Sequence, residues 1–271
     1  MLVSELEAAL LELFPAEQAE VWDRVGLSVG CGGEEVHGVA CALDATRETI
    51  EAAHARDANV LLTHHLLFLE PPARLVCDAQ DEPVAAALWR AIELGVSVIS
   101  LHTNLDRSRQ VRELLPNLLG IPIAPGSLTS LEHAGAPDAP GLGSLFDVDS
   151  TALAAIADLV HAAFGSPPRV WGPAQVRVSR IAMLGGSLGD FGEHALRAGA
   201  DLIICGEAGY HKVLALAERG CHVMLLGHGV SEEPFCSILH EAARIAGVPA
   251  ERCCHIERPR TWWSPCEGGF A

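Results

Sequence analysis

Short apolar runs and amphipathic segments alternate along most of this chain. The runs 36–43, 59–63 and 96–101 have the length and residue types of buried strands, while 47–57 and 84–94 have apolar residues at helical spacing. A strand, a helix and a second strand in this order predict parallel strands joined by a right-handed crossover. The first part of the chain is therefore expected to form an α/β unit around a mostly parallel sheet.

The same alternation returns in the second half of the chain. We expect strands over 177–184, 201–205 and 222–226, with helices over 191–198 and 211–219 between them. Residues 116–143 are rich in proline and glycine, which is typical of a linker between domains. Three further helices are expected over 4–14, 149–164 and 234–246, and a last strand over 250–256. Ser4 is expected to cap the first of these helices.

The two halves repeat one plan, including the chemistry of their strand ends. The runs and helices of residues 39–98 correspond one by one to those of 181–223. In each half the last strand ends in a histidine that is followed four residues later by an acid. The pairs are His102 with Asp106 and His228 with Glu232. Any α/β protein repeats strands and helices, but that does not place the same His-x-x-x-acid pattern twice, so an internal duplication is indicated.

Histidines and acids gather where the predicted strands end. The run 59–63 leads directly into His64 and His65, and ligands bind at the carboxyl ends of strands in open α/β sheets. Taken alone, two adjacent histidines are more often hydrogen-bonded core residues than metal ligands. Here the strand ends together present a larger set of candidates: His64, His65, His102, Asp106, Glu207, His228 and Glu232.

This donor set predicts a particular class of metal centre. Imidazole together with carboxylate suits Zn, Fe or Mn better than Mg or Ca. The number of candidates exceeds what one structural zinc needs, so two divalent ions bridged by a carboxylate fit the count better. Paired ions of this kind activate water and hold an oxygen of a phosphoryl or carbonyl substrate. The sequence therefore favours a metal-dependent hydrolase.

Composition narrows the classes of partner and compartment. The 271 residues carry a formal net charge of −17, which disfavours binding to nucleic acid or to an anionic membrane surface. No apolar run is long enough to span a membrane and the acidic N-terminus does not resemble a signal peptide, so we expect a cytoplasmic protein. The nine cysteines contain no CxxC and are expected to be reduced and buried, with a redox role for Cys253-Cys254 as the weaker alternative.

Six segments of the chain resemble, in order, motifs of the NIF-three-like family, whose members are often catalogued as type 2 GTP cyclohydrolase I homologues. These segments are 22–30, 43–46, 63–65, 100–106, 206–207 with His211, and 227–232. The resemblance implies a dinuclear centre on His64, His65, Asp106, His228 and Glu232. It also places three further side chains close to that centre as catalytic groups, orienting groups or substrate contacts, namely His102, Glu207 and His211.

The resemblance also implies an architecture and an activity. It implies two α/β lobes with the second inserted into the first, here 1–123 with 230–271 and 124–229. It further implies a homohexameric ring whose metal sites face an inner cavity. The implied activity is metal-dependent hydrolysis of a small molecule, either GTP cyclohydrolase-like ring opening or cleavage of another nucleotide or phosphoester. A non-catalytic ring that stores, delivers or senses metal, or scaffolds a partner, would carry the same ligands, and this alternative stays open.

Overall fold

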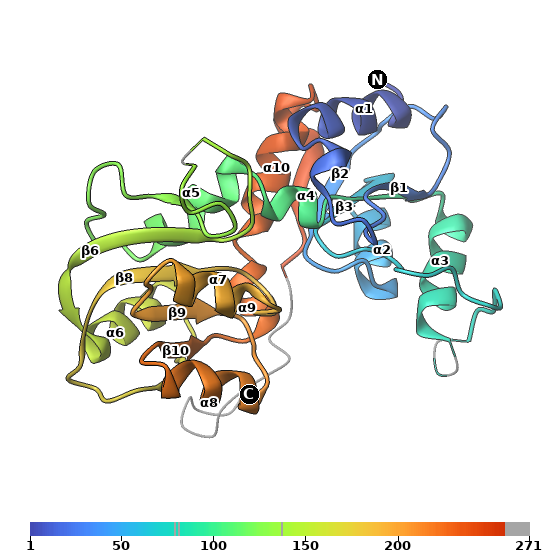
Figure 1. Cartoon of the computed structure of the whole chain (residues 1–271). Helices are drawn as coiled ribbons and strands as arrows, with labels where there is room; N and C mark the ends of the chain where they lie inside the picture. The colour runs from blue at the N-terminus through green and yellow to red at the C-terminus, as the bar shows by residue number, and fades with distance from the viewer. Residues whose placement is uncertain (79, 81, 137, 258–271) are drawn as a thin grey trace.

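The computed structural model describes residues 1–257 apart from 79, 81 and 137, and its chain forms two β-sheets covered by helices (Figure 1). The predicted α/β fold with two lobes is confirmed. Residues 259–271, which the resemblance assigns to the first lobe, lie outside the described residues. Among the described helices, none is long and apolar enough to cross a membrane.

The first sheet contains the strand that leads to the histidine pair. Its order is β1–β4–β3–β2–β11, and all neighbours are parallel except β1 and β4. The strands are β1 (Gly26–Val29), β2 (Val39–Ala42), β3 (Val60–Thr63), β4 (Ser97–Ser100) and β11 (Cys253–His255). Every residue of β2, β3 and β4 is buried, which explains why these strands were recognisable as largely apolar runs.

Helices cover both faces of this sheet. The apolar stripes of α1 (Val3–Leu13) and α10 (Phe235–Ile245) pack on one face, and those of α2 (Arg47–His54) and α3 (Pro83–Leu94) on the other. The prediction that Ser4 caps the first helix is wrong. The helix begins at Val3 because the carboxylate of Glu5 accepts a hydrogen bond from the Leu2 amide at 2.8 Å.

The second sheet is mixed, with a parallel centre and antiparallel edges. Its order is β5–β6–β8–β9–β10–β7, in which only β8–β9 and β9–β10 are parallel. The strands are β5 (Thr129–Ser130), β6 (Ser144–Ala152), β7 (Arg169–Trp171), β8 (Arg177–Met183), β9 (Leu202–Cys205) and β10 (His222–Leu225). The parallel centre repeats the arrangement of β2, β3 and β4, in which each strand lies beside the next one along the chain.

The structure adds elements that the sequence patterns did not predict. β6 occupies positions where a helix was expected from residue 149, and α6 (Leu153–Phe164) begins only after it. α5 (Arg109–Leu118) enters the segment interpreted as a linker and carries Pro116 near its end. The helices α7 (Phe191–Arg197) and α8 (Tyr210–Glu218) follow prediction. Two short helices, α4 (Thr103–Asp106) and α9 (His228–Glu232), carry the acids of the repeated His-x-x-x-acid pairs. His102 directly precedes α4, and His228 begins α9.

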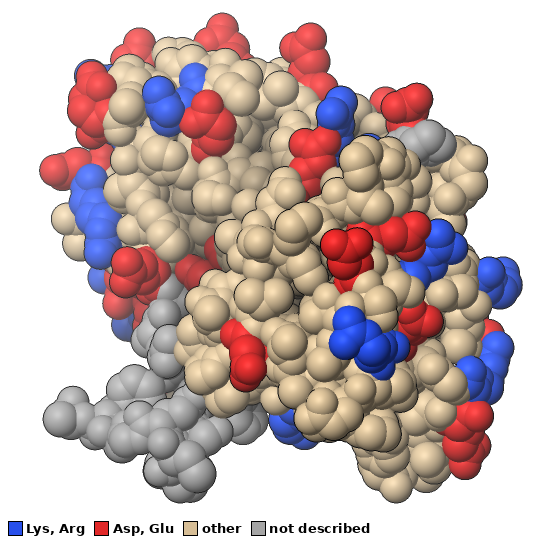
Figure 2. Space-filling model, turned by 90° about the vertical axis from the view of Figure 1, so that its left-hand side faces the viewer, with Lys and Arg blue, Asp and Glu red and all other residues tan. Residues whose placement is uncertain are grey.

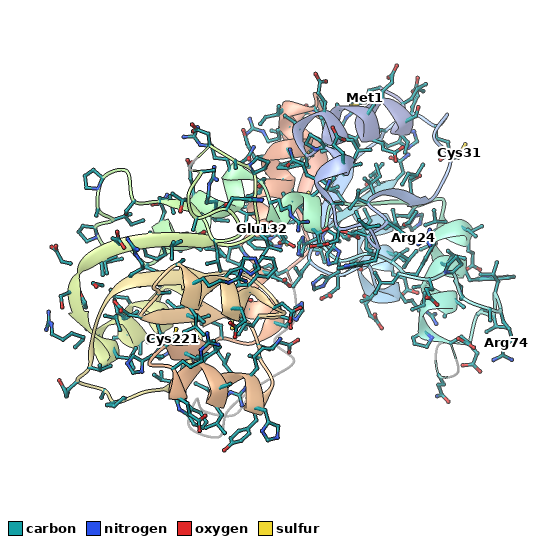
Figure 3. All side chains as sticks on the ribbon, in the orientation of Figure 1. Met1, Arg24, Cys31, Arg74, Glu132 and Cys221 are labelled. Atoms are coloured by element: carbon teal, nitrogen blue, oxygen red, sulfur yellow. The ribbon has the colours of Figure 1, made fainter. Side chains whose placement is uncertain are left out.

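A continuous junction connects the two lobes. One cluster of buried side chains runs from β2 and β3 to β8 and β9, by way of α5, α6 and α10. Arg107 adds polar contacts at this boundary, because its guanidinium donates to Glu20 at 2.6 Å and to Glu132 at 2.9 Å. Figure 3 labels Glu132 between the lobes. The ends of β3, β4 and β10 are thereby brought to one place.

Candidate metal centre

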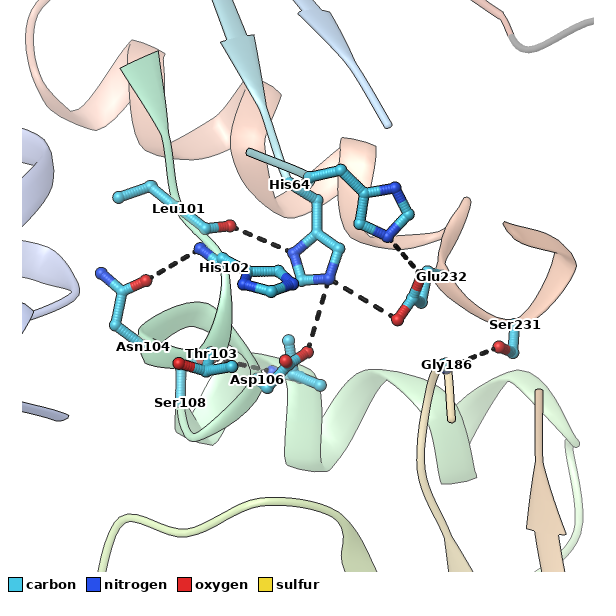
Figure 4. Close-up of polar contacts among 12 residues, drawn as sticks. His64, Leu101, His102, Thr103, Asn104, Asp106, Ser108, Gly186, Ser231 and Glu232 are labelled. Atoms are coloured by element: carbon cyan, nitrogen blue, oxygen red, sulfur yellow. Dashed lines mark hydrogen bonds and ion pairs between the residues drawn. The ribbon is translucent and has the colours of Figure 1, made fainter. Parts of the chain in front are cut away.

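The histidine pair directly follows β3 and is fixed by hydrogen bonds at the strand end. The Thr63 hydroxyl donates to the carbonyl of His65 at 2.7 Å and lies 2.9 Å from the Ser100 hydroxyl on β4. α4, which follows β4, brings Asp106 toward His64, and α9, which follows β10 of the second sheet, brings Glu232 (Figure 4). The ends of the two sheets therefore supply opposite sides of one cluster.

Glu232 lies at the centre of this cluster. Its Oε2 is 2.9 Å from His65 Nε2 and 3.1 Å from His228 Nε2, while its Oε1 is 3.7 Å from His64 Nε2. Asp106 Oδ1 lies at the same distance of 3.7 Å from His64 Nε2. The structure thus brings together all five side chains that the family resemblance assigns to a dinuclear centre.

Hydrogen bonds at Nδ1 orient the imidazole rings. His64 Nδ1 lies 3.1 Å from the carbonyl of Leu101, His65 Nδ1 lies 2.7 Å from Asp44, and His228 Nδ1 lies 2.9 Å from Glu207. Each of these oxygens accepts the Nδ1 proton of its histidine. In all three rings Nε2 is therefore the nitrogen that faces Glu232, and in His64 it also faces Asp106. This is the arrangement by which proteins fix the tautomer of metal-binding histidines and raise their basicity.

The buried ring of His64 provides the strongest indication of a metal ion. Its Nε2 is fully enclosed and has no hydrogen-bond partner among the described residues, although two carboxylates lie 3.7 Å away. That separation is too long for a hydrogen bond, and a buried polar atom without a partner costs free energy. A cation between these groups would satisfy all of them. Ligand atoms of His64, His65 and Glu232 lie within 4.8 Å of one another, so this group can hold a metal ion.

The charges of the site are strongly coupled. Burial raises the pKa of Asp106. Burial alone would also raise the pKa of Glu232, but hydrogen bonds from His228 and His65 and the nearby charge of His64 hold it well below its usual range. Burial opposes protonation of His65, yet its contacts with Asp44 and Glu232 raise its pKa to about 9. In the metal-free protein, protons on the imidazoles therefore supply the positive charge that a cation would otherwise provide.

Glycines of the second lobe leave room for Glu232. Gly186 has a φ of +60°, and a Cβ at this position would overlap Glu232 Oε1. A Cβ on Gly185 would lie 2.9 Å from Glu232 Cγ. The Gly186 amide also donates to Ser231 Oγ at 2.9 Å, which fixes the turn against α9 (Figure 4). The turn between β8 and α7 therefore forms one wall of the site.

The three predicted catalytic residues occupy different places. The His102 ring lies 5.2 Å from that of His64, centroid to centroid, and its Nδ1 lies 3.1 Å from both oxygens of Asp23. Glu207 accepts the hydrogen bond from Nδ1 of His228. His211 is exposed on α8, and its described ring contact is with Tyr210 at 5.4 Å rather than with the cluster.

Two functional side chains were not singled out from the sequence. Asp23 binds His102 and also accepts a hydrogen bond from the Thr103 amide at 3.0 Å. Burial opposes its ionisation, but these bonds lower its pKa to about 2. Asp44 orients His65. The sequence signal for both residues was their place in family-like segments, 22–30 for Asp23 and 43–46 for Asp44. Arg24 of the first segment is labelled in Figure 3 and donates to the Leu69 carbonyl at 3.0 Å.

Comparison with known proteins agrees with this site and fold. The sequence profile of the family described as Duf34/NIF3 (NGG1p interacting factor 3) matches residues 1–251. The chain belongs to the Duf34/NIF3 family. The resemblance inferred from six short segments is thereby confirmed over nearly the whole of the described chain.

Relatives of this Duf34/NIF3 protein have been catalogued in several bacteria. It is 28% identical over 235 residues to a "GTP cyclohydrolase 1 type 2 homolog" of Clostridium acetobutylicum, covering 86% of this chain and 85% of the relative. A relative with the same name in Streptomyces coelicolor is 29% identical over 242 residues, covering 87% and 83%. Among solved structures, a Bacillus cereus protein related to NIF3 superposes with a TM-score of 0.82 at 19% identity, covering 98% of both chains, and so shares the fold.

This Duf34/NIF3 chain also has a pocket on the second lobe, between β7, α8 and β10. The pocket has a volume of about 270 Å³ and is lined on the second lobe by Arg169, Trp171 and Tyr210. The rings of Trp171 and Tyr210 meet edge to face at 5.7 Å between centroids. Ala208 contributes to the lining and directly follows Glu207, which holds His228.

Proposed function

We propose that this Duf34/NIF3 protein is a dinuclear-metal-dependent hydrolase of a nucleotide or a related phosphoester. The observation that carries the proposal is the buried, unpartnered Nε2 of His64 between Asp106 and Glu232. Two ions are favoured over one because the oxygens of Glu232 face different imidazoles. Oε1 faces His64, whereas Oε2 faces His65 and His228, as expected for a bridging carboxylate.

Nitrogen and carboxylate donors favour Zn, Fe or Mn as the ions. When bound, such ions polarise a substrate oxygen and lower the pKa of a water molecule. The chain itself supplies an acid–base group in His102, whose Nδ1 is held by Asp23 so that Nε2 can transfer a proton at the substrate. Glu207 orients His228 through the hydrogen bond at Nδ1.

The pocket on the second lobe supports the choice of substrate class. Trp171 and Tyr210 offer aromatic faces to a planar base, and Arg169 offers a guanidinium to an anionic group. The catalogued name of the relatives, "GTP cyclohydrolase 1 type 2 homolog", is compatible with a purine nucleotide. Lys and Arg side chains on the face shown in Figure 2 are scattered among Asp and Glu, which favours a small molecule over a nucleic acid.

The test begins with the metal content of protein purified without added metal. Wild type should contain about two ions per chain by mass spectrometry, and His65→Ala and Glu232→Ala should lose at least one of them. His161→Ala, on α6 outside the cluster, is the matched control and should keep both. The metal-loaded wild type is then screened against nucleotides and phosphoesters. Absence of metal after reconstitution would contradict the centre, and metal without turnover of any substrate would favour the non-catalytic ring.

We further propose that the chain works in the cytoplasm as a homohexameric ring. The resemblance to NIF-three-like proteins supports the ring. Large apolar side chains exposed on α3, among them Trp89 and Ile92 at 46% and 62% exposure, are compatible with burial between copies of the chain.

A further inference from the structure

A second group of metal-binding side chains lies outside the five ligands described above. Glu233 follows α9, Cys236 lies in the first turn of α10, and His255 ends β11. One carboxylate oxygen, the sulfur and one ring nitrogen of these residues all lie within 4.8 Å of one another. Two segments that are distant in the sequence, the stretch 233–236 and the end of β11, therefore bring three different kinds of ligand to one point.

The fold holds each of these segments in place. β11 pairs in parallel with β2, with His255 opposite Cys41, and the Ile256 amide donates to the Cys41 carbonyl at 2.8 Å. Cys236 is buried on the side of α10 that faces this sheet. Successive residues on a helix point about 100° apart, so Glu233 does not follow its neighbour Glu232 into the first centre.

The hydrogen bonds of this group are incomplete in a way that points to a cation. Glu233 Oε1 lies 3.1 Å from His255 Nε2 and is satisfied there. Glu233 Oε2 is buried and has no hydrogen-bond partner among the described residues. A buried carboxylate oxygen without a partner is costly, and a cation shared with the neighbouring sulfur and nitrogen would satisfy it.

We propose that Glu233, Cys236 and His255 bind one zinc ion at a site independent of the dinuclear centre. Sulfur, nitrogen and carboxylate oxygen together are a zinc donor set, and three protein ligands leave the fourth position to water. His255 is 37% exposed and Glu233 31%, so the ion can enter from solvent. On binding, the Cys236 thiol releases its proton to solvent, and His255 uses Nε2 while its remaining proton sits on Nδ1.

The site would tie the C-terminal strand of the first sheet to the segment that carries the Glu232 ligand. Zinc binding is therefore expected to raise the melting temperature of the protein in addition to any effect of the first centre. This inference does not rest on the proposed hydrolase activity, because it requires no turnover.

Cobalt substitution distinguishes the two centres. None of the five ligands of the first centre contains sulfur, so a thiolate-to-cobalt charge-transfer band in the near ultraviolet reports only on the proposed site. The full chain loaded with Co²⁺ should show this band, and zinc titrated into it should remove the band. Cys236→Ala and His255→Gln should lose the band, whereas His65→Ala, which disrupts the first centre, should keep it.

Cys221→Ala is the matched control, since Cys221 is also buried but packs in the second lobe away from these residues. It should keep the band at wild-type intensity. His255→Gln changes a partly exposed side chain, so it tests the proposal even if Cys236→Ala fails to fold. A folded wild type without the band, or a band that persists in Cys236→Ala, would overturn the proposal while leaving the dinuclear centre untouched.

Discussion

The imidazoles of the first centre are the residues whose protonation should respond most visibly to a metal. The pKa of His65 rises to about 9 in the metal-free fold, and that of His228, through its hydrogen bond to Glu232, also to about 9. The ordinary value is near 6.5, so folding favours the protonated rings. The resulting stability is complete below pH 6.5 and is lost as the pH rises through about 9.

Metal-free protein should therefore be less stable at pH 10 than at pH 7, with His65 alone contributing on the order of 2 kcal/mol to the difference in free energy of unfolding. Metal-loaded protein should lack most of this loss, because the ion replaces the protons. Urea denaturation of both forms across this range measures the effect.

Metal affinity should rise over the same range, by up to about tenfold per pH unit for each proton displaced. Affinity that does not change with pH would show that these histidines are not ligands.

Asp44 should control metal affinity through the orientation and basicity of His65. Asp44→Asn keeps a hydrogen-bonding oxygen near Nδ1 but removes the negative charge, so metal affinity should fall by roughly 10–100-fold. Competition with a chelator of known affinity measures the change. Asp158→Asn on the exposed side of α6 serves as control and should bind metal like wild type. An Asp44→Asn variant with unchanged affinity would show that this carboxylate does not control metal binding by His65.

At the scale of elements, the turn between β8 and α7 can be tested with two glycine substitutions. Gly186→Ala places a methyl group into Glu232 at a φ of +60°, so the variant should lose metal and about 1–3 kcal/mol of stability. Gly189→Ala lies in the same turn with a φ of +50°, but its methyl group meets no atom closer than 4.0 Å. It should show a similar backbone cost and keep its metal. Thermal unfolding of both variants measures the cost of backbone strain, and metal analysis shows whether the added methyl group disturbs Glu232.

The same scale shows what local sequence patterns could and could not predict. β2 and β3 were predictable because they are buried on both faces, and each therefore has an unbroken apolar signal. β6 was missed because its outer half is polar. Its Asp147 is satisfied by Arg180 on the neighbouring strand at 2.6 Å, a contact that no local pattern contains. Pro116 suggested a linker, although it lies near the end of α5. The packing of Val111 and Leu115 in the buried core stabilises this helix despite the proline.

The candidate metal ligands were predictable for a related reason. His64 and His65 directly follow a buried strand, and each acid of the His-x-x-x-acid pairs lies in a short helix that begins at its histidine or directly after it. Asp23 could not be found in this way, because its partners His102 and Thr103 lie about eighty positions further along the chain. Its role depends on how β1 pairs with β4, which places the loop before β1 near the end of β4.

At the scale of the whole molecule, metal binding and assembly can be tested separately. One chain supplies all five candidate ligands and the groups that hold the Nδ1 atoms of its three histidines, so we expect metal binding not to depend on assembly. The proposed ring should sediment at six times the 28.6 kDa chain mass. On dilution or in high salt, any dissociated chains should retain the same metal content per chain as the ring. A single-chain species at all concentrations would contradict the ring, whereas loss of metal on dissociation would mean that a neighbouring copy supplies a ligand.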